Sequence, residues 1–179
     1  MVDLSSHLTW ATRALQDVSW GRKSQRSLMR IEPQPLIAPD ARLIVLFSPK
    51  AACTNVTIWF FQQLGRIAEA REYSRWPHRY RLQPYYDSAL YRRACRLDLT
   101  GFKVVRVIRD PYDRAASSFR HAIRARRIMP VIAEHLGDPD MMTRGMSFEQ
   151  FMTFLESVDI ATCDPHFRLQ RHPVEDLLP

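Results

Sequence analysis

The sequence predicts an α/β fold in which a short central parallel sheet is flanked by helices. Residues 43–47 and 103–108 form short runs rich in apolar, β-forming residues, a pattern typical of buried strands. Each run leads within a few residues into a segment with apolar residues at three- and four-residue spacing, which predicts a helix. Two strands that each pass into a helix are typical of a parallel sheet.

The first strand, Leu43–Phe47, is broken by residues 48–54, and a helix is predicted from Asn55 onward. The second strand is followed by Asp110 as N-cap and Pro111 at the first helical position. This helix should run to about Arg127, with one apolar stripe formed by Tyr112, Ala115, Ala116, Phe119 and Ile123.

A third helix is predicted by the capping box at 147–150. The Arg- and Tyr-rich region 71–96 should be helical in part. Residues 1–40 are interpreted as an N-terminal extension and linker, with an amphipathic helix over Leu8–Val18. The linker carries three prolines, Pro33, Pro35 and Pro39.

The chain has 179 residues, about one domain, with 46% hydrophobic and 25% charged residues, an ordinary globular balance. Its longest apolar run, Leu43–Phe47, is too short to span a membrane, and no secretory leader is visible at the N-terminus. Three widely spaced cysteines predict neither a disulfide framework nor a zinc site. We therefore expect a soluble, cytoplasmic protein.

The five glycines exclude two classes of nucleotide site. No two of them lie closer than eight residues, so neither G-x-G-x-x-G nor G-x-x-x-x-G-K-[ST] is present. A dinucleotide oxidoreductase and an ordinary P-loop kinase are therefore disfavoured. The net charge of +7 favours anionic partners without saying which.

Cations follow both strands, where a parallel sheet places ligands against helix N-termini. Lys50 lies in a loop whose small residues let backbone amides approach an anion, and Thr54 and Asn55 add side-chain donors. Such a loop can wrap a phosphate as a P-loop does, without its glycines. A plain turn with an exposed lysine is the alternative. With such a loop after a strand of a central sheet flanked by helices, the predicted architecture is a P-loop-like three-layer fold.

After the second strand, Arg109 precedes the N-cap, and Ser117 lies about two helical turns further on. A guanidinium and a hydroxyl so placed could hold one terminal phosphate. An Arg109 paired with Asp110 or Asp113, together with a solvated serine, is the alternative.

Taken together, Pro49–Asn55 (PKAACTN) and Val107–Arg120 (VIRDPYDRAASSFR) resemble the sulfotransferases, most closely the carbohydrate sulfotransferase (family 2) branch. The segments 147–151 and 164–170 also look like the family's downstream segments, with Phe167 where Trp is usual. The resemblance covers about residues 42–171 within a domain predicted over 41–179. Because relatives usually continue with more helix after the His166 segment, we expect a short or truncated member.

The resemblance implies that the donor is 3′-phosphoadenosine 5′-phosphosulfate (PAPS). It implies that the first motif holds the 5′-phosphosulfate, and that Arg109 and Ser117 hold the 3′-phosphate. Lys50 is the predicted catalytic cation, because negative charge grows on the bridging oxygen during transfer. No metal is expected, since PAPS needs no divalent clamp and no tight acidic cluster is seen. The implied donor-loop residues are Pro49, Lys50, Ala51, Ala52, Cys53, Thr54 and Asn55.

The acceptor hydroxyl also needs a base, and the family supplies it from varied places. His78 is the first candidate, in an interval where family members can place a catalytic histidine; the alternative is a surface histidine in an Arg-rich loop. His166 is the second candidate.

The predicted function is sulfuryl transfer from PAPS to a hydroxyl of a carbohydrate acceptor, which can be acidic, with no nucleic-acid partner. Two alternatives remain open: a non-catalytic anion- or nucleic-acid-binding module, and a nucleotide kinase. The first would use two arginine clusters, one at 92–96 and one at 120–127. Neither the sulfated position nor the oligomeric state can be derived from the sequence.

Overall fold

The computed structural model describes residues 13–15, 33–125 and 127–177. The chain divides into two compact units, described separately below. The first unit comprises Met1–Ile108 and Arg171–Pro179, and the second is Arg109–Gln170. The domain boundary predicted after residue 40 stays a prediction.

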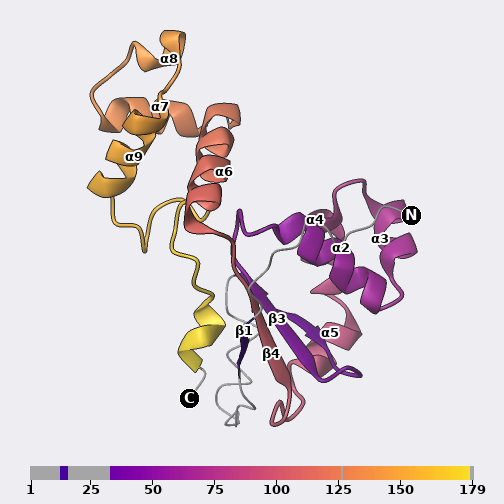
Figure 1. The fold of residues 1–179 in the computed structure, drawn as a ribbon. Helices are drawn as coiled ribbons and strands as arrows, with labels where there is room; N and C mark the ends of the chain where they lie inside the picture. The colour runs from indigo at the N-terminus through magenta and orange to yellow at the C-terminus, as the bar shows by residue number, and fades with distance from the viewer. Residues whose placement is uncertain (1–12, 16–32, 126, 178–179) are drawn as a thin grey trace. The chain divides into compact units, whose positions relative to one another are not determined.

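A four-stranded sheet in the order β1-β4-β3-β2 is the centre of the first unit (Figure 1). Both predicted strands are present, as β3 (Leu43–Phe47) and β4 (Lys103–Val107), and they pair in parallel. At the sheet edges, β2 (Leu36–Ala38) and β1 (Arg13–Leu15) pair antiparallel to their neighbours. The α/β class is confirmed, but the sheet is mixed rather than purely parallel.

A tight turn explains the antiparallel pairing of β2. The chain reverses between Ala38 and Leu43, where the Arg42 N–H donates to the Pro39 carbonyl at 3.0 Å. So short a connection can join only antiparallel strands. Leu36–Ala38, which the sequence analysis places in the linker, is thus a fully buried strand. The helix predicted over Leu8–Val18 is wrong at Arg13–Leu15, which form β1; the rest of it lies outside the described residues.

Three tyrosine hydroxyls hold the segment 34–37 in place. The Tyr85 hydroxyl accepts from the Ile37 N–H at 3.1 Å and donates to the Ile37 carbonyl at 2.8 Å. Tyr91 and Tyr86 donate to the carbonyls of Pro35 and Gln34, at 3.1 and 2.6 Å. These bonds satisfy backbone groups that an edge strand leaves unpaired.

The helices of the first unit confirm that region 71–96 is helical in part. The helix after β3 is confirmed, although it begins at Cys53, two residues early, and ends before Ile67, which opens the next helix. Phe61 of this helix packs edge-on against Tyr80 and Tyr85, with ring centroids 4.9 and 5.3 Å apart. The elements are α2 (Cys53–Gln63), α3 (Ile67–Tyr73), α4 (Pro77–Tyr80), the π-helical turn η2 (Arg81–Tyr85), α5 (Ala89–Ala94) and η3 (Pro173–Leu177).

The described part of the second unit is helical and has its own core. The predicted N-cap at Asp110 and the capping box at Ser147 and Gln150 are both confirmed. The core is apolar and rich in aromatic residues, and includes Ala122, Ile132, Phe151, Phe154 and Phe167. Its helices are α6 (Pro111–Arg124), α7 (Ile128–His135), α8 (Met141–Arg144) and α9 (Phe148–Ser157).

The apolar stripe predicted for α6 is only partly buried: Phe119 packs against the rings of Phe148 and Phe151. Tyr112 and Ile123 are 86% and 45% exposed, whereas the buried residues are Arg114, Ser118 and Ala122, which share one face at four-residue spacing. Burial of Ser118 is tolerated because its hydroxyl donates to the His166 carbonyl at 3.0 Å. None of the described helices is both long and apolar enough to cross a membrane.

Candidate functional site

The loop between β3 and α2 has an unusual backbone. Lys50 and Ala52 both adopt left-handed conformations, with φ of 66° and 55°, and the Ala51 N–H closes a turn onto the Ser48 carbonyl at 3.2 Å. For a residue with a Cβ this conformation costs roughly 1–2 kcal/mol. Strain of this kind is concentrated at functional sites, and turns of this kind create concave groups of N–H donors that bind anions.

The N-terminus of α2 leaves its donors available to a ligand. Its N-cap residue, Ala52, makes no side-chain capping bond, and the first turn holds no acidic residue. The first helical bond runs from the Val56 N–H to the Ala52 carbonyl at 3.0 Å, so the helix itself does not use the N–H groups of residues 53–55. Thr54 and Asn55 are exposed there. A helix end with free N–H groups and no negative charge favours an anion.

The structure brings His78 to this loop, 24 residues away in sequence. Its Nε2 lies 3.1 Å from the Thr54 Oγ1, and the residue is only 6% exposed. The short helix α4 fixes its position, starting at Pro77 directly before it. Burial, aided by the positive charge of Arg81, lowers the pKa of His78 to about 4. The imidazole is therefore neutral at physiological pH.

Sequence reasoning missed Arg81, whose guanidinium lies 5.0 Å from the ring centroid of Phe47, the last residue of β3. The ring of Tyr86 lies 5.9 Å from the same group. Aromatic faces stabilise a guanidinium in this way. Arg81 thus supports the end of β3 while its charge acts on His78. One arginine among many carried no signal that could have singled it out.

Arg109 and Ser117 belong to the second unit, whereas Lys50, Thr54 and His78 belong to the first. Arg109 and Ser117 are therefore described separately here. The Arg109 backbone is held on both sides by Gln170: its N–H donates to Oε1 at 2.8 Å, and its carbonyl accepts from Nε2 at 2.7 Å. Gln170 fixes the backbone from which the Arg109 side chain projects. Sequence reasoning gave Gln170 no role, although the segment 164–170 contains it.

The N-terminus of α6 differs from that of α2 because it is already capped. The Asp110 carboxylate accepts from the N–H groups of Tyr112 and Asp113, at 3.0 and 3.1 Å. Asp113 adds a second acid in the first turn. An anion here would have to be bound by side chains, such as those of Arg109 and the half-buried Ser117, rather than by helix amides.

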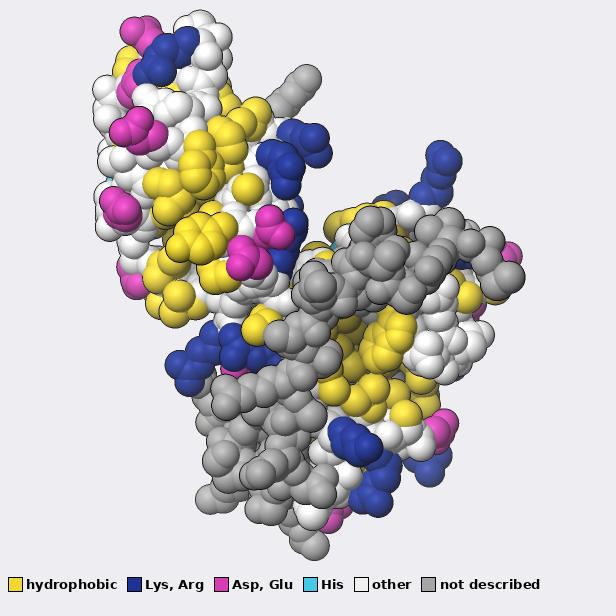
Figure 2. Space-filling view, in the orientation of Figure 1, with side chains coloured by type: hydrophobic (Ala, Val, Ile, Leu, Met, Phe, Trp, Pro, Cys, Tyr) yellow, Lys and Arg dark blue, Asp and Glu magenta, His cyan; other side chains and the backbone are white. Residues whose placement is uncertain are grey.

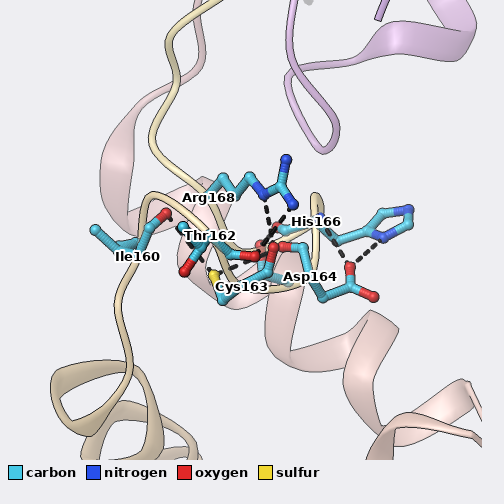
Figure 3. Close-up of polar contacts among 7 residues, drawn as sticks. Ile160, Thr162, Cys163, Asp164, His166 and Arg168 are labelled. Carbon is cyan, nitrogen blue, oxygen red and sulfur yellow. Dashed lines mark hydrogen bonds and ion pairs between the residues drawn. The ribbon is translucent and has the colours of Figure 1, made fainter. Parts of the chain in front are cut away.

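His166, the second candidate base, is paired with an acid (Figure 3). Its Nδ1 lies 2.8 Å from the Asp164 Oδ1, which also accepts from the His166 N–H at 2.9 Å. Arg168 donates to the carbonyls of Cys163 and Thr162, which secures the same loop (Figure 3). The pair fixes the orientation of the imidazole, as an acid does in catalytic dyads.

A cavity of about 520 Å³ lies in the second unit, and none of the predicted site residues lines it. Its lining includes the apolar side chains of Ile132, Phe154 and Phe167. Basic side chains gather on this unit (Figure 2): Arg120 and Arg124 of α6 are exposed, as on an ordinary solvated helix face, and so is Arg127, the residue before α7. Across the described residues, no group of three or more His, Cys, Asp or Glu could hold a metal ion.

Comparison with known proteins identifies the family. A family model described as "Sulfotransferase family" matches residues 33–173, which include β2, both strand–helix junctions and the His166 segment. No curated protein and no solved structure gave a match. The match begins at Pro33, in keeping with the inclusion of β2 in the sheet. The chain belongs to the sulfotransferase family, in its family 2 branch.

Proposed function

We propose that this protein transfers a sulfuryl group from PAPS to a hydroxyl of a carbohydrate acceptor, on a P-loop-like three-layer fold. The observation that carries the proposal is the loop at residues 50–55, with two left-handed residues leading into an uncapped helix N-terminus. Family membership supports sulfuryl transfer as the reaction. Backbone amides at an uncapped helix N-terminus suit the phosphosulfate end of the donor.

In this proposal Lys50 and the amides of residues 52–55 bind the phosphosulfate. The acceptor oxygen forms a new bond to sulfur while the bond from sulfur to the phosphate oxygen breaks, and 3′-phosphoadenosine 5′-phosphate (PAP) leaves with the electron pair. The Lys50 ammonium and the helix amides stabilise the charge that grows on the departing oxygen. Arg109 and Ser117 bind the 3′-phosphate at the other end of the donor.

His78 is the proposed base, and the Thr54 hydroxyl relays the proton from the acceptor to it. The imidazole is nearly fully buried, but its Nε2 contacts the hydroxyl of Thr54, which is an exposed residue. Thr54 passes its proton to Nε2 as it takes the proton of the acceptor hydroxyl. A pKa of about 4 keeps the imidazole unprotonated at physiological pH, so it can accept a proton. The same low pKa makes it a weaker base than an ordinary histidine.

The test is a binding and turnover comparison on the full chain. Calorimetry with PAP, ATP and a short DNA duplex separates a sulfotransferase from a kinase and from a nucleic-acid-binding module. We expect PAP to bind and to be released from PAPS when an oligosaccharide acceptor is supplied. Tighter binding of ATP or DNA than of PAP would contradict the proposal, as would the absence of sulfated product with every oligosaccharide offered.

A further inference from the structure

The segment 164–170 is attached beside both residues proposed to bind the 3′-phosphate. At its end, the Gln170 side chain bonds to the N–H and the carbonyl of Arg109, at 2.8 and 2.7 Å. Nearer its start, a backbone carbonyl accepts from the hydroxyl of Ser118, the neighbour of Ser117 on α6, at 3.0 Å. The position of this one segment therefore bears on both residues.

A stacked pair of histidines joins the start of this segment to α6. The rings of His121, on α6, and His166 lie with centroids 3.9 Å apart and planes tilted by 33°. The His166 ring also approaches the Asp164 carboxylate, with Nδ1 2.8 Å from Oδ1 (Figure 3). Phe167 secures the segment independently, because its ring is buried in the core of this unit. Since histidine is the side chain that titrates near neutral pH, the attachment contains groups whose charge can change.

Asp164 is the acid that balances this pair. Burial raises the pKa of its carboxyl, but hydrogen bonds from His166 and the charges of His166 and His121 outweigh burial and bring the pKa below its usual value. Burial also raises the pKa of the adjacent Cys163 thiol, which therefore stays neutral. The carboxylate thus supplies one negative charge, enough to balance a single proton on the pair.

The other charges near the pair oppose a second proton. On α6, the exposed Arg124 lies one helical turn after His121, and the buried Arg114 lies two turns before it. Arg168, on the segment itself, donates to two backbone carbonyls. These guanidinium groups add positive charge, which disfavours a second imidazolium beside them. The acids and the histidine of the helices packed on α6 are all exposed: Glu134, His135, Glu149 and Glu156.

We propose that His121, His166 and Asp164 are positioning residues for the 3′-phosphate site and make its affinity for the donor depend on pH. While the pair carries at most one proton, the stack holds the segment on α6. When both rings are protonated, two adjacent cations share one carboxylate, and their repulsion loosens the segment that fixes Arg109. The attachment disfavours the second proton, so it weakens as the pH falls. This inference rests on the proposed function for its ligand, although the attachment itself can be measured without one.

The first experiment is amide hydrogen exchange of the full chain by NMR, at about pH 8 and about pH 5. The reporter is the Arg109 N–H, which donates to Gln170. After correction for intrinsic exchange, we expect this amide in the parent to exchange about 3- to 10-fold faster at the lower pH. H121F keeps a ring against His166 but cannot take the second proton, so its response to pH should be much smaller.

Two further variants sharpen the exchange experiment. H135F is the matched control: His135 is exposed on α7, and its ring contacts that of Phe154, with centroids 5.3 Å apart, rather than an imidazole. H135F should respond to pH as the parent does. D164N removes the charge that balances the pair, so the Arg109 amide should lose protection at a higher pH than in the parent. This variant keeps the test decisive if H121F does not fold.

Calorimetric titrations with PAP and AMP connect the attachment to binding. The parent and H121F should prefer PAP equally at the higher pH, whereas at the lower pH the preference should be about 3- to 10-fold larger in H121F. Both proteins meet the same ligand, so protonation of its phosphate cancels from the comparison. Because the 3′-phosphate does not react, the effect should appear in KM for PAPS and leave kcat unchanged.

The inference is overturned if exchange at Arg109 in the parent is independent of pH, or if H121F responds as strongly as the parent. Loss of the response in H135F, or protection in D164N that matches the parent at every pH, would also overturn it. Equal preference for PAP in the parent and H121F at the lower pH would do the same. Failure of the parent to bind PAP at either pH would count against the proposed function, whereas hydrogen exchange still decides whether the histidine pair holds the segment.

Discussion

The two helix N-termini that follow the central strands have opposite chemistry. α2 starts without a side-chain cap or an acid and after two left-handed residues, whereas α6 starts with Asp110 accepting two N–H groups and Asp113 beside it. One end therefore offers backbone amides to an anion, and the other has already satisfied them. The same strand–helix pattern thus supports recognition by amides at one place and by side chains at the other.

The largest expected effect on turnover comes from removing the proposed base that takes the proton of the acceptor hydroxyl. His78→Gln should lower kcat by about 10²–10⁴-fold, the range of general base catalysis, with PAP affinity nearly unchanged. Thr54→Val should share most of this loss, whereas Thr54→Ser, which keeps the hydroxyl, should retain turnover. Because the imidazole must be neutral to accept a proton, kcat should fall only as the pH approaches about 4.

Steady-state kinetics over a pH series, with PAP calorimetry beside it, measures both effects. Normal turnover in His78→Gln would remove the base assignment. So would an acidic limb near pH 6.5, the ordinary histidine value, because it would indicate a different titrating group.

At the α2 junction, Lys50→Ala should reduce kcat by about 10²–10³-fold and PAP affinity far less, because the ammonium opposes charge that develops in the transition state. Lys50→Gly is the control for the left-handed backbone, since glycine adopts this conformation freely. Equal loss in both variants assigns the effect to the ammonium. Lys50→Arg should rescue poorly, because a planar guanidinium does not replace a compact ammonium. Single-turnover rates that match the parent in Lys50→Ala would refute its role.

A charge placed at the open helix end tests recognition by amides. Ala52→Asp and Ala52→Asn are matched in size, and both residue types tolerate a left-handed backbone. The aspartate should weaken PAP binding about 10-fold or more relative to the asparagine, through repulsion of the phosphate. Equal PAP affinities in the two variants would mean that the anion does not bind at this helix end.

The smallest effect is expected at the capped end. Asp110→Ala should lower the free energy of unfolding by about 1 kcal/mol, the usual cost of a lost N-cap, while Asp110→Asn should lose little. Urea unfolding curves of the two variants give the comparison directly. A loss as large in the asparagine variant as in the alanine variant would show that the cap contributes through its charge alone.

The sequence predicted the features that depend on local pattern. Leu43–Phe47 is a continuous run of apolar β-formers, and Asp110-Pro111 and Ser147-Gln150 are helix starts whose hydrogen bonds close within a few residues. His78 was singled out as a candidate base only by family resemblance, and its contact with Thr54 is a finding of the structure. The roles of these residues stay predictions.

What the sequence did not reveal depends on partners distant in the chain. Leu36–Ala38 lies between prolines, and its place as a strand rests on β3 and on the hydroxyls of Tyr85 and Tyr91. The buried face of α6 includes Ser118, whose burial depends on the His166 carbonyl 48 residues away. Arg81 lies against the ring of Phe47 and lowers the pKa of His78. No pattern in residues 78–86 predicts either interaction.

The most direct test of the account is the affinity of the parent protein for PAP against that for AMP, which lacks the 3′-phosphate. If amides bind one end of the donor while Arg109 and Ser117 bind the 3′-phosphate, calorimetry should show PAP binding roughly 10- to 100-fold more tightly. Arg109→Ala should remove most of that preference and leave AMP binding nearly unchanged. Equal affinities for PAP and AMP in the parent protein would contradict the account.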